Sequence, residues 1–288
     1  MSVHSARTAR PARSAEPAPS VRTGPPGPPG HPGDPLSATV AVLRRAGCVF
    51  AEEEAALLDA AASSPHHLAR LVELRAAGLP LEHVLGWAEF RGRRYAVDRG
   101  VFVPRRRTEF LVARAVALAP RRAVVVDLCC GSGALGLALA AEADAAELHA
   151  CDIEPAAVRC ARRNVDGHGR VYQGDLFEPL PAALRGRVDV LLANVPYVPA
   201  GDVELLPAEA RVHEPRLALD GGGDGLDVLR RVAAEAPGWL APGGSLLVEA
   251  GERQREAAVR MVRAAGLAAR VEVSEELYAT VVIGTAGG

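Results

Sequence analysis

The chain of 288 residues contains no lysine, since all 33 of its basic residues are arginine. Its five cysteines are odd in number and lack a Cys-x-x-Cys spacing, which argues against a disulfide framework or a zinc site and favours a reducing cytoplasm. No apolar run approaches the roughly 20 residues that span a bilayer. The net charge of −2 gives no bulk attraction to nucleic acid or to an anionic membrane. We expect a cytoplasmic monomer that binds no metal, membrane or nucleic acid stably.

Residues 1–35 show no periodic placement of apolar residues. Arginines stand among Ala, Ser and Pro, and Gly-Pro-Pro triplets follow at 24–30. The triplets are too few for a collagen helix, so we expect a stiff, solvated, disordered extension. A transit peptide is the alternative interpretation, because the beginning is rich in arginine and poor in acids.

Residues 36–85 have the apolar spacing of a small helical domain. The pattern predicts three helices, over 40–45, 52–61 and 67–77. Ser37 and Ser64 are the expected caps of the first and third helices, and Gly78 is expected to end the third.

Residues 86–104 alternate around Gly92, which predicts a β-hairpin linker with Trp87 and Phe90 in its core. A helix is predicted to follow over 108–118. From residue 105 to 288, strand and helix patterns then alternate. Strands are predicted at 123–128, 147–152, 170–174, 188–194, 245–250, 269–274 and 278–283. Helices are predicted at 133–142, 155–164, 225–236 and 252–265. This alternation is typical of a doubly wound α/β fold with a mostly parallel, seven-stranded sheet.

A glycine-rich turn follows the first of these strands. Gly131-Ser132-Gly133-Ala-Leu-Gly136 matches G-x-G-x-x-G, a pattern that several nucleotide cofactors share. Asp127 ends the strand just before the turn, where a nicotinamide-binding fingerprint usually has an apolar residue. Its carboxylate would repel a pyrophosphate, whereas it suits the methionyl ammonium of S-adenosylmethionine. The turn therefore favours the latter cofactor.

Two further acids follow the next two strands. Asp152 stands about twenty residues after the glycines, at the distance at which an acid meets a ribose diol. Asp175 is positioned to accept a hydrogen bond from an adenine amine, with Leu176 packing near the ring. The structural alternatives are a helix cap for Asp152 and a turn for Asp175. Chemically suited residues at four successive strand ends favour cofactor binding.

The fourth strand ends in the turn Asn194-Val195-Pro196-Tyr197. The Asn194 amide oxygen and the Val195 carbonyl offer two acceptors for a planar NH₂ group. Pro196 stiffens the turn, and Tyr197 supplies a flat face. The alternatives are a strand-end turn for Asn194 and a core aromatic for Tyr197. Glu249 is expected to support the nearby loop without taking part in the chemistry.

In their order, these motifs resemble class I methyltransferases of the HemK type, the protein-(glutamine-N5) methyltransferases that modify peptide release factors. The resemblance runs from about residue 78 to 284, and it includes the segments 103–109, 214–215, 222–226 and 249–251. It implies a Rossmann-like methyltransferase domain over 105–288 behind a helical domain that engages the protein substrate. The implied reaction is N-methylation of a glutamine side-chain amide of a release factor-like protein, with S-adenosyl-L-methionine as cofactor.

The resemblance also assigns site residues. The expected cofactor-binding residues are Asp127, Cys129, Cys130, Gly131, Ser132, Gly133, Asp152, Ile153, Asp175, Leu176 and Asn194. The expected catalytic residues are Asn194, Val195, Pro196 and Tyr197. The expected substrate-binding residues are these same four with Arg105, Thr108 and Glu109.

Three departures from the family pattern indicate a related subgroup. Val195 replaces the first proline of Asn-Pro-Pro-Tyr, which keeps the carbonyl acceptor but removes one φ constraint. Cys129 replaces the first loop glycine and is expected to crowd a close backbone approach. Arg106 and Arg107 replace Pro and Asp of Pro-Arg-Pro-Asp-Thr-Glu and add charge near the mouth of the site.

Three other functions stay open at this point. The N6 amine of adenine in RNA or DNA presents the same planar NH₂ group, and its methylation would require a basic groove and base flipping. A nicotinamide oxidoreductase is opposed by Asp127 and by the Asn194 turn. A methyltransferase-like binding module without activity would result if Cys129 blocked the cofactor.

Overall fold

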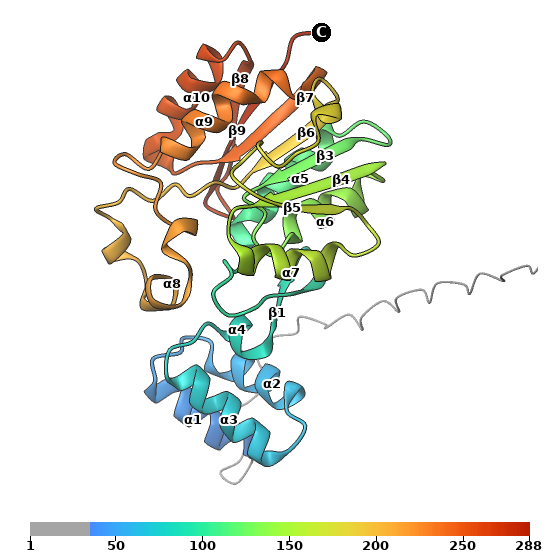
Figure 1. The fold of residues 1–288 in the computed structure, drawn as a ribbon. Coiled ribbons are helices and arrows are strands. Elements are labelled where there is room, and N and C mark those ends of the chain that lie inside the picture. The colour runs from blue at the N-terminus through green and yellow to red at the C-terminus, as the bar shows by residue number, and fades with distance from the viewer. Residues whose placement is uncertain (1–34) are drawn as a thin grey trace, which may run out of the picture.

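The computed structural model describes residues 35–288, so residues 1–34 of the predicted extension lie outside the described part. A cluster of short helices lies beside a larger α/β domain, and a two-stranded hairpin stands between them (Figure 1). Among residues 35–288, no helix has the length and apolar character needed to cross a bilayer.

The helical cluster contains α1 (Pro35–Arg45), α2 (Ala51–Ala61), α3 (Pro65–Ala76) and α4 (Leu81–Leu85). Its core is a set of buried apolar side chains, namely Leu43, Ala51, Ala55, Leu58, Leu71, Val72 and Val84. The Ser64 side chain accepts a hydrogen bond from the His67 N–H at 3.1 Å, which confirms the predicted cap of α3. The predicted cap at Ser37 is wrong, because α1 already begins at Pro35, a residue suited to the first helical turn.

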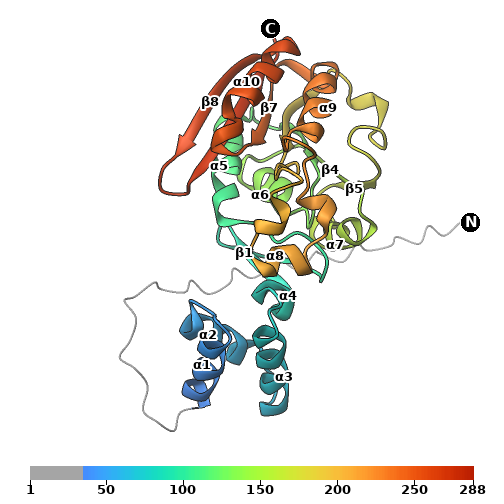
Figure 2. The same cartoon turned by 90° about the vertical axis from the view of Figure 1, so that its left-hand side faces the viewer.

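Arg75 connects this cluster to the α/β domain. It is buried, and its Nε donates to Glu54 Oε2 of α2 at 2.6 Å. Its Nη1 donates to Glu209 Oε1 at 2.6 Å, and Glu209 belongs to α8 (Ala208–His213), which lies between the two parts of the chain (Figure 2). None of the residues of α8 is buried.

The hairpin pairs β1 (Trp87–Phe90) with β2 (Arg93–Ala96) through a two-residue turn. Both turn residues have positive φ, 48° at Arg91 and 69° at Gly92, as a type I′ turn requires. Phe90 is fully buried, as predicted, whereas Trp87 is half-buried beneath the Arg94 guanidinium, which lies 3.9 Å from the ring centroid.

Seven strands form the main sheet, in the order β5-β4-β3-β6-β7-β9-β8. They are β3 (Val124–Leu128), β4 (Glu147–Asp152), β5 (Arg170–Gln173), β6 (Val188–Ala193), β7 (Leu240–Glu249), β8 (Ala268–Ser274) and β9 (Ala279–Thr285). β9 runs in the direction opposite to the other six strands, and this mostly parallel sheet confirms the predicted doubly wound class. The strand predicted at 245–250 begins five residues earlier, because Pro242 and the adjacent glycines form a bulge rather than a loop.

Helices cover both faces of this sheet. One face packs against α5 (Glu109–Leu118), α6 (Ala134–Glu142) and α7 (Pro155–Val165), and the other against α9 (Asp227–Glu235) and α10 (Arg255–Ala264). Along β3, Val125 packs in the core on the side of α5 and α6, whereas Val124 and Val126 pack in the core on the side of α9 and α10. Burial on both sides explains why the central strands read as nearly continuous apolar runs.

Candidate active site

A cavity of about 680 Å³ opens at the carboxyl ends of the central strands. The chain leaves β3 toward one side of the sheet and returns at β6 on the other, so this is a topological switch point, where α/β folds bind ligands. The predicted residues that line it are Arg105, Cys129, Gly131, Asp152, Ile153, Asp175, Leu176, Asn194, Val195, Pro196 and Tyr197. The cavity continues along the linker before α5 and along the segment 206–219, so it is wider than a cofactor site alone.

Six predicted residues do not line the cavity, namely Asp127, Cys130, Ser132, Gly133, Thr108 and Glu109. Thr108 is buried, and Glu109 Oε1 accepts the Arg91 backbone N–H at 3.1 Å, toward the hairpin. The turn η1 (Arg106–Thr108) thus directs these two residues away from the cavity, and we do not retain them as substrate-binding residues.

Asp127 shapes the glycine turn from below. Its Oδ2 accepts the Gly136 N–H at 2.9 Å, and a Cβ at Gly136 would lie 2.8 Å from the carboxylate. The carboxyl is almost completely buried, and this desolvation raises its pKa from the ordinary 3.8 to about 7. Asp127 therefore supports the turn, while its contact with the cofactor stays a prediction.

This raised pKa predicts a specific pH dependence of stability. Folded Asp127 keeps its proton up to about pH 7, whereas the unfolded chain releases it near 3.8. Between these values the folded state binds more protons, so the free energy of unfolding falls as pH rises, by up to about 4 kcal/mol. Asp127→Asn should lack this component in urea unfolding from pH 4 to 8, while Asp189→Asn should retain it. Parallel profiles for wild type and Asp127→Asn would contradict the assignment.

The Asp152 carboxylate fastens the glycine turn to β4. Its Oδ2 accepts the Gly131 N–H, and its Oδ1 accepts the Glu154 N–H at the start of α7, both at 2.9 Å. Burial raises the pKa of this carboxyl. The alternative of a helix cap is wrong for Asp152, because Glu154 is the N-cap of α7 and no side chain caps that helix. Asp152 instead holds the turns on either side of it and lines the cavity.

Cys129 stands in the cavity wall with a left-handed φ of 53°. Glycine adopts this conformation without strain, whereas other residues lose roughly 1–2 kcal/mol. The cavity nevertheless stays open beside Cys129, so the predicted crowding does not close the site. Burial raises the pKa of its thiol well above the ordinary value, so the thiol is protonated at neutral pH.

Glycine should be tolerated at 129 and costly at 130. In Cys129→Gly, relief of strain offsets the entropy that glycine adds to the unfolded chain, so stability should change by less than about 1 kcal/mol. Cys130 is buried and has no positive φ, so Cys130→Gly loses packing and should cost about 2–3 kcal/mol. Urea unfolding of the two variants measures the difference, and equal losses would disprove strain at 129.

Two residues of the cofactor prediction have distinctive surroundings. Asp175 Oδ2 forms an ion pair with Arg231 Nη2 of α9 at 2.7 Å, so one of its oxygens is already occupied. Ile153, although apolar, is 46% exposed and lines the cavity, as a side chain does when it packs against a ligand ring.

The turn after β6 carries a buried polar atom without a hydrogen-bond partner among the described residues. Asn194 Oδ1 is buried, and none of the described residues donates a hydrogen bond to it. Such an acceptor costs free energy unless a partner arrives, so it marks a place for a donor. Next to it, Val195 is buried and Tyr197 is half-buried. The Tyr197 hydroxyl donates to Glu249 Oε1 at 3.3 Å.

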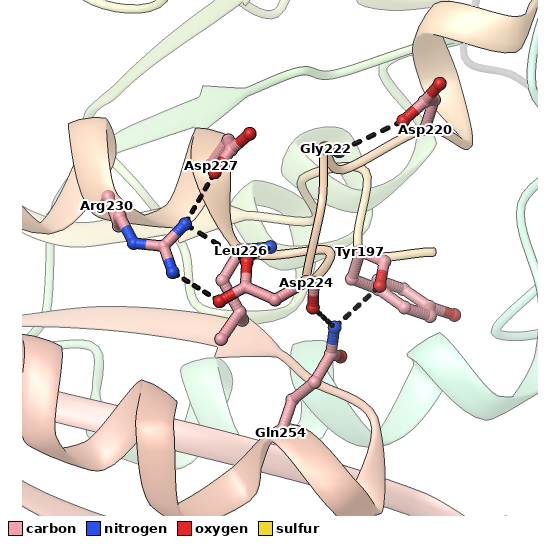
Figure 3. A network of polar contacts seen from close by, with 8 residues as sticks. All are labelled: Tyr197, Asp220, Gly222, Asp224, Leu226, Asp227, Arg230 and Gln254. Carbon is pink, nitrogen blue, oxygen red and sulfur yellow. Dashed lines mark hydrogen bonds and ion pairs between the residues drawn. The ribbon is translucent and has the colours of Figure 1, made fainter. Parts of the chain in front are cut away.

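The loop 221–225, called the glycine loop below, and Gln254 support the backbone of this turn (Figure 3). Gln254 Nε2 donates to the carbonyl oxygens of Tyr197 at 2.8 Å and of Asp224 at 3.0 Å. A Cβ at Gly225 would lie 2.3 Å from the Tyr197 oxygen, and one at Gly221 would lie 2.6 Å from the Pro196 oxygen. Only glycine permits the two segments to approach this closely.

Two arginines of the linker, which line the cavity, reach buried carboxylates behind its wall. Arg105 pairs with Glu214, and Arg107 pairs with Glu249 at 2.7 Å. Glu214 and Gln254 were absent from the predicted site. Segment 214–215 belongs to the family resemblance, but no role was assigned to it there. The partners of Glu214 and Gln254 are 109 and 57 residues away, so neither contact is visible in a local pattern.

The chain is similar to known methyltransferases. A family model described as "Methyltransferase small domain" matches residues 99–232. A release factor glutamine methyltransferase of Geobacter sulfurreducens is 41% identical over 199 residues, which cover 68% of this chain and 69% of that protein. This identity and coverage show that the chain belongs to the same methyltransferase family as the Geobacter protein. Membership confirms the predicted HemK-type family, the methyltransferase class and S-adenosyl-L-methionine as cofactor.

Other proteins similar to this chain are named for different methyl acceptors. A 4-amino-L-phenylalanine/4-methylamino-L-phenylalanine methyltransferase of Streptomyces pristinaespiralis is 40% identical and covers 65% of this chain and 66% of that protein. A T. thermophilus 16S rRNA methyltransferase, solved with AdoMet and guanosine, has a TM-score of 0.50 at 21% identity, covering 69% of this chain and 49% of that one. This second likeness concerns the fold alone.

Proposed function

We propose that this methyltransferase transfers a methyl group to the side-chain amide nitrogen of a glutamine in a protein, and that a peptide chain release factor is its substrate. The single observation that carries the proposal is the buried Asn194 Oδ1, which has no donor among the described residues and lies in the wall of the cavity. A primary amide supplies two N–H donors in a plane, which matches this oxygen together with the Val195 carbonyl.

The cavity suits the cofactor as well as the amide. The wall combines the Asp152 carboxylate, the exposed Ile153 side chain and the open glycine turn at 131, which fit a ribose diol, an adenine ring and a methionyl group respectively. Bound S-adenosylmethionine supplies an electrophilic methyl group. Asp127 contributes from beneath the turn by holding its shape.

The residues of the Asn194 turn supply orientation and electrostatic stabilisation. An amide nitrogen is a poor nucleophile because its lone pair is delocalised into the carbonyl. Asn194 Oδ1 and the Val195 oxygen accept its two N–H groups, and their dipoles stabilise the positive charge that develops on nitrogen. Tyr197 packs against the planar group and limits its rotation. The methylated nitrogen is then acidic enough to release a proton to water, so no general base is required.

Labelled cofactor tests the substrate. The purified protein is incubated with methyl-labelled S-adenosylmethionine and a lysate of its source, and samples are treated with protease or with nuclease. We expect acid-precipitable label that protease removes, with mass spectrometry placing one methyl group on a glutamine of a release factor. Label removed by nuclease would favour the N6 amine of adenine, and acid-soluble label would favour a small arylamine. Either result would overturn the proposal.

We further propose that the enzyme acts as a monomer in the cytoplasm without stable nucleic-acid binding. The described cavity is built by one chain, and the net charge of −2 offers no general attraction to a polyanion. Under this proposal the helical segment 36–85 and the hairpin 86–104 stand beside the catalytic part at 105–288.

A further inference from the structure

The Arg107 side chain approaches the Tyr197 ring from the linker before α5. Its Nε lies 2.7 Å from Glu249 Oε1, a charge contact whose alignment falls outside that of a hydrogen bond. Its guanidinium carbon lies 5.6 Å from the centroid of the Tyr197 ring. The same Glu249 oxygen accepts the Tyr197 hydroxyl at 3.3 Å. One carboxylate therefore receives both the arginine and the tyrosine.

Glu249 depends on this arginine. Its side chain is 1% exposed, and Oε2 is buried with no hydrogen-bond partner among residues 35–288. A buried carboxylate is stable as an anion only when a cation is paired with it. Arg107 is the only described cation that forms an ion pair with Glu249.

Glu249 in turn orients Tyr197. Burial raises the pKa of the Tyr197 hydroxyl to about 12, so the group is protonated and donates at neutral pH. Its hydrogen bond to Glu249 fixes one end of the ring, and the turn fixes the other. A ring held at both ends presents one face to the cavity, where the substrate amide lies under the proposed function.

We propose that Arg107 is a positioning residue of this methyltransferase, which acts through Glu249 to fix the Tyr197 ring against the substrate amide. The contribution to turnover rests on the proposed function, whereas the effect on the ring does not. Arg107 is 34% exposed at the cavity mouth, so its removal opens no cavity in the core.

Arg114 provides a matched control. It pairs with Glu272 at 3.0 Å, it is 36% exposed, and its guanidinium carbon lies 5.7 Å from the Phe110 ring centroid. Arg114→Ala thus removes the same kind of contact on a helix outside the cavity. Arg107→Lys keeps the charge without the guanidinium. The double variant Arg107→Ala/Glu249→Gln removes both charges together, so it leaves no unpaired buried carboxylate and serves if Arg107→Ala alone does not fold.

The first measurement reports the ring without any substrate. The protein is labelled with tyrosine enriched in ¹³C at Cζ, which gives one resonance for each of its four tyrosines, and Tyr197→Phe assigns the relevant line. We expect Arg107→Ala and Glu249→Gln to shift or broaden the Tyr197 line and to leave the other three unchanged. Arg114→Ala should leave the Tyr197 line unchanged. An unaltered line in Arg107→Ala would overturn the proposal.

The second measurement is a double-mutant cycle on turnover. Arg107→Ala should lower kcat by between about tenfold and a hundredfold, with cofactor affinity unchanged and partial rescue by Arg107→Lys. In the Tyr197→Phe background the same substitution should have almost no effect, because the hydroxyl through which it acts is missing. Equal losses in both backgrounds would overturn the proposal. Absence of glutamine methylation by wild type, with a responsive Tyr197 line, would instead refute only the proposed function.

Discussion

Asn194→Ala is expected to lower the turnover number by about 10²–10³-fold while cofactor affinity stays nearly unchanged. Removal of one preorganised dipole from a site of developing charge typically has an effect of this size. Stability should not fall, because Oδ1 is buried without a donor among the described residues and contributes no hydrogen bond to the fold. The three quantities are measured by methyl-transfer kinetics, by calorimetric titration with the cofactor and by urea unfolding.

The control for this variant removes a comparable amide elsewhere. Gln173 is exposed at the end of β5 and does not line the cavity, so Gln173→Ala should keep the kinetics of wild type. Turnover near the wild-type value in Asn194→Ala would remove this residue from the mechanism. A combined loss of turnover and stability would show that its role is structural.

Gly225→Ala is expected to reduce turnover about a hundredfold and to lower the free energy of unfolding by about 2–4 kcal/mol. The new Cβ would lie 2.3 Å from the Tyr197 oxygen and 2.4 Å from Gln254 Nε2, and φ is +76°. The left-handed backbone accounts for roughly 1–2 kcal/mol, and the displaced hydrogen bonds of Gln254 account for the remainder. A shift of about 1 Å in the Tyr197 turn is sufficient for the kinetic loss.

A neighbouring glycine separates this contact from general loop effects. Gly223 has no positive φ, and its Cβ would meet no atom within 4 Å, so Gly223→Ala should retain both activity and stability. The same assays apply to both variants. If Gly223→Ala and Gly225→Ala behaved alike, the glycine loop would not support the Tyr197 turn as described.

Local sequence patterns were sufficient for most of the sheet and for the centre of the site. The central strands β3, β6 and β9 were predicted because burial on both faces makes each a short, nearly unbroken apolar run, whereas the edge strands β5 and β8 are only partly buried. The turns at Asp152 and Asn194 were recognised because each directly follows such a strand. The elements that were missed, α4 and α8, have five and six residues and so are too short to show a helical period.

The supports of the site could not be predicted in the same way. Tyr197 meets Glu249 across 52 residues and Gln254 across 57 residues, and neither spacing is visible in a linear pattern. The placement of Asp127 was also hidden, because its role depends on the direction of a side chain beneath the turn. Long-range partners of this kind emerge only when strand order brings the ends of β6 and β7 together.

Arg75 limits how the chain can be divided for study. A fragment that starts at the hairpin would contain every strand of the sheet but would lose the guanidinium that holds Glu209. Because none of the residues of α8 is buried, that helix has little else to anchor it, and it borders the opening through which a polypeptide would enter. A truncated enzyme would therefore keep its cofactor pocket while its outer wall frays.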